Sequence, residues 1–223
     1  MMKYIKLLCV LLLVISLAGC HWWGKKDERL TPETLYSKGQ SAYQDGDYAD
    51  AITFFQRLKE EYPLSKYAIT AELKIADSYF NKEDYISAEL SYQDFLDFHP
   101  TNENLPYVMF QIGMCHFNQM RSIDRDQTET HRAKEAFEKL IARFPSSQYT
   151  FMAEKNLRDC RKKLAEHEFY VGNFYFKTGH YEAALKRFKE IENEYPNLGL
   201  DYKVSYYINE THKRIERQKG KKE

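Results

Sequence analysis

The chain has 223 residues, and its 33 lysines and arginines balance 33 aspartates and glutamates. This near-neutral composition gives no support to nucleic-acid binding, which draws on concentrated positive charge. The 18 tyrosines beside only 9 glycines favour helices that pack through aromatic side chains over a turn-rich β-sandwich.

The N-terminus has the order of residues that is typical of a secretion signal. Lys3 and Lys6 precede an apolar run over residues 7–17, and two small residues follow. The run is shorter than the roughly 20 apolar residues that a transmembrane helix needs. The sequence therefore predicts a signal peptide over residues 1–19 and not a membrane span.

A single cysteine follows this signal. Residues 17–20 read LAGC and resemble the lipobox of bacterial lipoproteins, which implies cleavage before Cys20 and attachment of a diacylglycerol and an N-acyl chain to it. Such an anchor holds a folded domain on a membrane, with residues 20–31 as a lipidated linker. The residue after the cysteine is His21 and not the aspartate that resembles an inner-membrane retention signal in enteric bacteria. This favours sorting of the protein to the outer membrane. The alternative is an ordinary secreted protein whose cysteine lies near the cleavage site by chance.

An internal repeat occupies most of the remaining chain. Residues 39–63 and 172–196 align without a gap and share glycine, tyrosine, alanine, phenylalanine and proline at the same steps. A third copy covers residues 76–100, and a split copy starts at Gly113 but has extra residues in its turn. The pattern resembles the tetratricopeptide repeat, a helix-turn-helix unit of about 34 residues. The expected fold is therefore all-α, a tetratricopeptide-repeat superhelix of about four helix pairs with a C-terminal capping helix.

The recurring residues have physical roles in such a unit. Small residues at Gly39 and Ala51 let the two helices of a pair approach closely, and Tyr48 and Phe55 are expected to fill the space beside them. Pro63 lacks an amide donor and its ring clashes with the preceding turn, so the second helix is expected to end there.

One long helix is expected between the third and fourth pairs. Residues 146–177 contain no proline, and apolar residues recur at alternating steps of four and three. His167 lies on this seam, where a hydrogen-bonded core histidine is expected instead of a ligand or a base. The segment from Asp201 to about Lys219 is expected to cap the open end of the array. The predicted seam consists of Ala153, Leu157, Cys160, Leu164, His167, Val171 and Phe174.

The sequence contains no HExxH, GxSxG, Walker or dinucleotide-binding pattern. The chain is therefore not expected to be an enzyme or to hold a metal, and no cofactor is expected besides the acyl chains on Cys20. Cys115 and Cys160 are expected to be two buried thiols, because no short cysteine spacing suggests a disulfide framework or a zinc site. A disulfide between them in an oxidising periplasm is the alternative.

Tetratricopeptide arrays have a concave surface lined by the first helix of each pair. If this surface is open, its aromatic side chains suit an extended peptide that carries aromatic residues. The alternative is that neighbouring helices cover about half of these positions. The positions expected to face inward are Tyr36, Gln40, Tyr43, Leu73, Asp77, Phe80, Phe110, Met114 and Phe117.

Several segments, taken in order, resemble the BamD family, lipoprotein subunits of the machinery that assembles β-barrel proteins in the bacterial outer membrane. The resemblance covers nearly all of the chain after the signal. Besides the lipobox and the opening GDYADAITFFQRLKEEYPLSKYA, it rests on PYVMFQIGM at 106–114, DRD at 124–126, FPSSQY at 144–149 and LAEHEFYVGNFY at 164–175.

The resemblance implies a lipid-anchored adaptor on the periplasmic face of the outer membrane. Residues 32–145 are expected to bind the C-terminal signal of unfolded barrel proteins, and residues 146–223 to bind the last POTRA domain of the barrel subunit BamA. Arg187 matches the family arginine that pairs with an acid on BamA, and Asp124 and Arg125 are also expected to contact BamA.

Other lipoproteins of the assembly machinery are further expected partners. The insertion around Asp124 is shorter than in enteric relatives, and the chain ends after about one helix of a fifth repeat. The alternative function is that of a different periplasmic tetratricopeptide lipoprotein, one that coordinates cell-envelope or division machinery.

Overall fold

The computed structural model describes residues 29–220, so the predicted signal peptide and the predicted anchor Cys20 lie outside the described residues. Over this range the chain forms nine α-helices and no strand. The helices are α2 (Pro32–Gln44), α3 (Tyr48–Glu61), α4 (Ala68–Asn81), α5 (Tyr85–Phe98), α6 (Leu105–Asn118), α7 (Thr128–Arg143), α8 (Gln148–Lys177), α9 (Tyr181–Glu194) and α10 (Asp201–Lys219).

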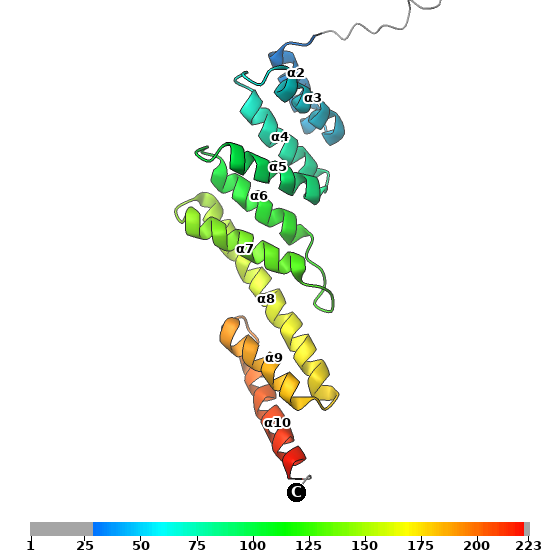
Figure 1. Cartoon of the computed structure of the whole chain (residues 1–223), viewed down its shortest axis with the longest axis vertical. Helices are drawn as coiled ribbons and strands as arrows, with labels where there is room; N and C mark the ends of the chain where they lie inside the picture. Colours follow the sequence, from blue (N-terminus) through cyan, green and yellow to red (C-terminus); the bar gives the residue numbers. More distant parts are fainter. Residues whose placement is uncertain (1–28, 221–223) are drawn as a thin grey trace, which may run out of the picture.

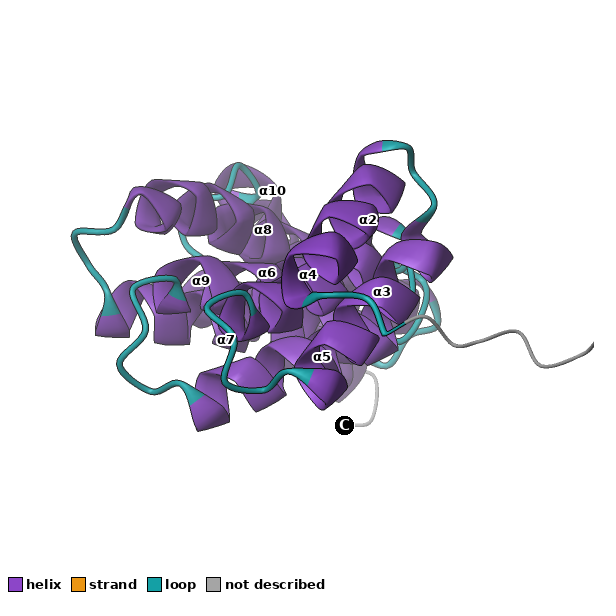
Figure 2. Ribbon diagram, turned by 90° about the horizontal axis from the view of Figure 1, so that it is seen from above, coloured by secondary structure: helices purple, strands orange, loops and turns teal. Residues whose placement is uncertain are grey.

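The helices stack into one elongated array (Figure 1). The pairs α2/α3, α4/α5, α6/α7 and α8/α9 follow one another, and α10 packs on α9 at the C-terminal end. Viewed along the long axis, α2 and α9 lie on different sides and successive pairs are not superimposed, so the array twists (Figure 2). The predicted all-α tetratricopeptide superhelix with four pairs and a capping helix is confirmed.

Glycines of the first helices mark where the two helices of a pair are closest. A Cβ atom added to Gly39 would lie 2.8 Å from the ring of Phe55, and one added to Gly172 would lie 2.7 Å from the ring of Phe188. A Cβ atom added to Gly113 would lie 2.5 Å from the ring of Phe137. The close approach expected at Gly39 is confirmed, and the ring of Phe55 lies directly against this glycine because only hydrogen occupies the side-chain position there.

The second helix of the first pair ends just before a proline, as expected. Helix α3 ends at Glu61, and the amide of Tyr62 donates to the Leu58 carbonyl oxygen before Pro63 directs the chain away. The Tyr62 hydroxyl donates to the Leu30 carbonyl at 2.9 Å. This bond ties the entry of the array to the end of its first pair.

Helix α8 is a single helix of 30 residues, as expected, but its buried face differs from the predicted seam. Ala153, Cys160 and Leu164 are buried, whereas Phe174 is 60% exposed. The seam is wrong at this end because the second half of α8 packs on α9 through another face, which includes Phe169.

The C-terminal helix and the cysteines agree with expectation. Val204 and Ile215 of α10 are buried, so this helix covers the open end of the fourth pair. Cys115 and Cys160 are both free and buried. Burial raises the pKa of each thiol to about 12, so both behave as core residues and not as reactive thiolates.

Candidate partner-binding surfaces

The inner surface of the first pair carries half-buried tyrosines that are held by α4 and the turn before it. The ring of Tyr36 stacks on Tyr67 with centroids 4.7 Å apart. The Tyr43 hydroxyl accepts a hydrogen bond from Asn81 Nδ2 at 2.7 Å, and the ammonium of Lys74 lies 4.5 Å from the centroid of its ring. These aromatic side chains, together with half-buried Gln40, keep part of their surface accessible in a fixed orientation.

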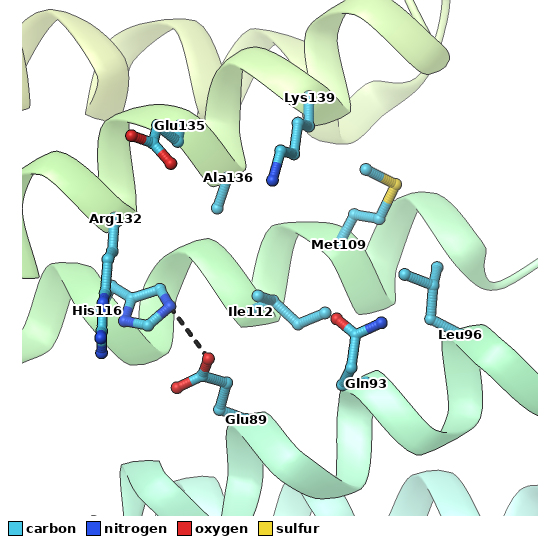
Figure 3. Close-up of a pocket in the computed structure, with 10 residues that line it drawn as sticks. All are labelled: Glu89, Gln93, Leu96, Met109, Ile112, His116, Arg132, Glu135, Ala136 and Lys139. Atoms are coloured by element: carbon cyan, nitrogen blue, oxygen red, sulfur yellow. Dashed lines mark ion pairs between the residues drawn. The ribbon is translucent and has the colours of Figure 1, made fainter.

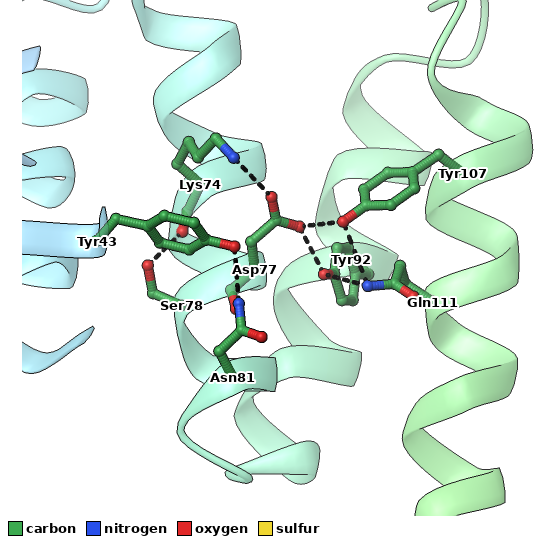
Figure 4. Close-up of polar contacts among 8 residues, drawn as sticks. All are labelled: Tyr43, Lys74, Asp77, Ser78, Asn81, Tyr92, Tyr107 and Gln111. Atoms are coloured by element: carbon green, nitrogen blue, oxygen red, sulfur yellow. Dashed lines mark hydrogen bonds and ion pairs between the residues drawn. The ribbon is translucent and has the colours of Figure 1, made fainter. Parts of the chain in front are cut away.

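Asp77, in contrast, is a buried acceptor that joins three helices (Figure 4). Its side chain accepts hydrogen bonds from the hydroxyls of Tyr92 in α5, at 2.7 Å, and Tyr107 in α6, at 2.6 Å. Lys74 lies 3.2 Å from its other oxygen. Burial and the nearby Asp77 charge raise the pKa of both tyrosines, which keeps their hydroxyls protonated as donors. Asp77 is 6% exposed, so the prediction that it lines an open groove is wrong.

The next positions of the predicted groove are also covered. Phe110 is buried, with its ring centroid 5.9 Å from that of Phe137 in α7 and 5.8 Å from that of Tyr149 in α8. The Met114 sulfur accepts from Asn156 Nδ2 of α8 at 3.1 Å. The prediction for Phe110 is wrong because α8 packs against α6 and covers this part of the face. Leu73 is likewise buried, whereas Met114, Phe80 and Phe117 are half-buried.

The connection between α6 and α7 is held from inside by polar side chains. Gln127 is buried, and its Nε2 donates to the carbonyl oxygens of Ser122 and Arg125, both at 2.9 Å. His167 of α8 hydrogen-bonds through Nδ1 to the Ile123 carbonyl oxygen at 2.6 Å. His167 is hydrogen-bonded as predicted, although it is half-buried and not fully in the core. The bond fastens the connection to α8.

Asp124 and Arg125 lie exposed on this fixed connection. Asp124 accepts from the Ser122 hydroxyl at 2.5 Å and lies 3.6 Å from the Arg125 side chain. The Ser122 hydrogen bond lowers the pKa of Asp124 below its ordinary value. The pair therefore presents one negative and one positive group to solvent.

Arg187 lies on α9 and already has an intramolecular partner. Its Nη1 donates to Glu168 of α8 at 2.7 Å, and Glu190 lies 4.0 Å away. The hydrogen bond to Glu168 raises the pKa of Arg187, and 37% of its side chain is exposed. A partner carboxylate must therefore share this guanidinium with Glu168 or displace it.

Neighbouring residues of α8 connect the two sets of predicted contact residues. His167 holds the α6–α7 connection that carries Asp124 and Arg125, and Glu168 holds Arg187. The structure thus connects both sets of predicted contact residues to one turn of α8, although they come from parts of the chain that are distant in sequence.

A pocket of about 260 Å³ lies between α5, α6 and α7 (Figure 3). His116 is buried there between two acids, with Nε2 3.3 Å from Glu89 and Nδ1 2.8 Å from Glu129. The pocket is not apparent from the sequence because three helices from two repeats form it. The available signal was a histidine within the apolar helix α6. The lining consists of Glu89, Gln93, Leu96, Met109, Ile112, His116, Arg132, Glu135, Ala136 and Lys139.

Comparison with known proteins gives matches over nearly the whole described range. The family profile described as YfiO, outer membrane lipoprotein, matches residues 28–223. The outer membrane protein assembly factor BamD of Vibrio cholerae is 28% identical over 206 residues, which cover 88% of this chain and 85% of the relative. The BamD of Neisseria gonorrhoeae is 28% identical over 208 residues, covering 86% of this chain and 78% of the relative.

Among solved structures, the complex of the TPR2AB domain of yeast Sti1 with pHSP90 aligns with a TM-score of 0.48 and 15% sequence identity. The alignment covers 82% of this chain and 70% of that one. Over residues 29–220 of the present structure, none of the helices combines the length and hydropathy needed to cross a bilayer.

Proposed function

Because the chain belongs to the YfiO family of outer-membrane lipoproteins, we propose that it is an adaptor subunit of the machinery that assembles β-barrel proteins in the outer membrane. The family match over residues 28–223 carries this proposal, and the BamD relatives support it. The protein acts by binding and positioning partners and not by catalysis. Acyl chains on Cys20 anchor it to the periplasmic face of the outer membrane.

The C-terminal half, together with the connection between α6 and α7, is the proposed contact for BamA. Arg187 offers a guanidinium, which can bind a carboxylate through two parallel hydrogen bonds. Asp124 and Arg125 add charges of both signs on a connection that is fixed before binding. A surface fixed in this way loses little conformational freedom on association.

The N-terminal pairs are the proposed contact for the C-terminal signal of unfolded barrel proteins. Burial of Asp77 and Phe110 restricts this surface to the first two pairs, where Tyr36, Tyr43 and Phe80 remain half-buried. Aromatic rings that are already oriented can pack against aromatic residues of an extended peptide at low entropic cost.

Arg187 provides the sharpest test of the BamA contact. Arg187→Glu alone puts a third acid beside Glu168 and Glu190, so a binding loss could come from a disturbed α8–α9 pair. The charge swap Arg187→Glu with Glu168→Arg restores an intramolecular pair but reverses its orientation. We expect the swap variant to melt like the wild type and yet bind BamA at least about tenfold more weakly, because an unpaired interfacial charge costs about 2–5 kcal/mol.

The matched control is Glu168→Gln, which removes the intramolecular acid and keeps the arginine. This variant should retain the affinity for BamA or increase it, since Arg187 no longer has to be shared. Binding is measured by biolayer interferometry with detergent-solubilised BamA. Wild-type affinity in the swap variant would remove Arg187 from the interface.

A further inference from the structure

Helix α9 runs beside only the second half of α8 (Figure 1). Residues spaced by three and four along a helix share a face, so the face of α8 that meets α9 near Gly172 and Ala165 continues toward Arg161 and Arg158. A groove of about 620 Å³ lies at this place, between the first half of α8 and the turn from α9 to α10. We call it the α8 groove, with Phe151, Lys155, Arg158 and Arg161 on one side and Pro196 and Leu198 on the other.

The charge of the α8 groove is mostly positive. Arg161 donates to the Glu194 carbonyl oxygen at 3.1 Å, and Arg158 lies within 3.4 Å of the Asn197 carbonyl oxygen. Within residues 29–220, neither these arginines nor Lys155 forms an ion pair with a carboxylate. Glu154 is the acidic side chain of the lining, against three cations. Because an arginine has five N–H donors, each guanidinium keeps donors for an added anion.

Apolar surface accompanies this charge. Phe151, in the first turn of α8, lines the groove and is 78% exposed. From Phe151 to Arg161 the helix rises by about 15 Å, which is the length of about three turns of a second helix. A binding segment would therefore need an apolar residue near one end and acidic residues along its length.

We propose that the α8 groove binds an acidic, amphipathic segment of a partner protein. The segment occupies the place beside α8 that α9 leaves uncovered, with its carboxylates on Lys155 and Arg158 and its apolar side chain on Phe151. This surface differs from the Arg187 contact and from the N-terminal tyrosines, so its occupant is an additional partner. A groove with an aromatic end favours a peptide over a flat anionic membrane.

The test uses the full mature chain in detergent and a designed probe. The probe is a fluorescein-labelled 15-residue helical peptide with four glutamates on one face and leucine and phenylalanine on the other. A second peptide carries lysines in place of the glutamates. We expect fluorescence anisotropy to show binding of the acidic peptide and none of the basic one, with an affinity that falls as salt increases.

Two variants locate the site. Lys155→Glu with Arg158→Glu should weaken binding of the acidic peptide at least tenfold, and Phe151→Ser should weaken it several-fold. The matched control, Lys59→Glu with Lys82→Glu, changes the net charge equally at exposed positions of the first two pairs and should bind like the wild type. Melting curves confirm that each variant is folded.

Three results would overturn the proposal. The Lys155 and Arg158 variant could keep wild-type affinity, or the control could lose affinity to the same extent, which would indicate unspecific charge attraction. Binding to phosphatidylglycerol vesicles without binding to the acidic peptide would show that the groove recognises lipid headgroups and not a protein segment.

Discussion

The turn between the two helices of a pair places one residue in the left-handed backbone region. Gly46 has φ 83° and Gly179 has φ 82°, and in the second pair Glu83 stands at the same step with φ 64°. Glycine adopts this conformation without a Cβ clash, whereas other L-residues are strained by about 1–2 kcal/mol. The second pair therefore stores strain in its turn that the first and fourth pairs avoid.

Relieving this strain is a residue-scale prediction. Glu83→Gly should raise the free energy of unfolding by up to about 1 kcal/mol, because the gain in the turn exceeds the added chain entropy of the unfolded state. Gly46→Ala should lower it by about 1 kcal/mol. A Cβ at Gly46 would have no neighbour within 4 Å, so that loss reports the backbone alone. Urea unfolding followed by circular dichroism measures both, and a destabilised Glu83→Gly chain would contradict the strain argument.

At the scale of elements, one buried carboxylate joins three helices that also pack through apolar and aromatic side chains. Asp77 is the common acceptor of Tyr92 and Tyr107, and Gln111 Nε2 lies 3.2 Å from the Tyr107 hydroxyl. The carboxylate thus fixes α5 and α6 relative to α4. Buried polar groups that are fully paired in this way specify one packing arrangement.

Removing the shared acceptor should destabilise the chain more than removing one donor. Asp77→Ala leaves the two tyrosine hydroxyls without this acceptor. Each buried unpaired group should lower the free energy of unfolding by about 1–3 kcal/mol. Tyr107→Phe removes one donor and should cost about 1 kcal/mol. Asp94→Ala, at an exposed position of α5, is the control and should have little effect. Equal unfolding midpoints for Asp77→Ala and Asp94→Ala in guanidinium would rule out the proposed role of Asp77.

For the molecule as a whole, the repeat spacing predicted the helix pairs because each step has a local cause, such as Gly39 at the closest approach or Pro63 after a helix end. Burial of Phe110 could not be predicted from one pair, since α8 provides the cover. The ion pair between Arg187 and Glu168 joins two helices, so no single-helix spacing indicates it. The α8 groove arises because α9 is shorter than α8, which becomes visible only when both are placed in space.

Within residues 29–220 the main contacts of each pair are with its neighbours, so damage to one end of the array should stay at that end. Gly39→Val adds side-chain atoms where a Cβ alone would meet the Phe55 ring at 2.8 Å, and such overpacking costs about 1–3 kcal/mol. Gly172→Val does the same at Phe188, beside the Cβ of Arg187.

We expect hydrogen exchange to show lost amide protection in α2 and α3 for Gly39→Val, and in α8, α9 and α10 for Gly172→Val. Ser41→Val, on the exposed side of α2, adds the same side chain without the clash and serves as the control. In binding assays, Gly39→Val should weaken the binding of a barrel-signal peptide and leave the affinity for BamA unchanged. Gly172→Val should weaken the binding of BamA and leave the affinity for the peptide unchanged. If either variant lost protection along the whole array, the two ends would form one cooperative unit, and separate binding losses could no longer assign the partners to separate halves.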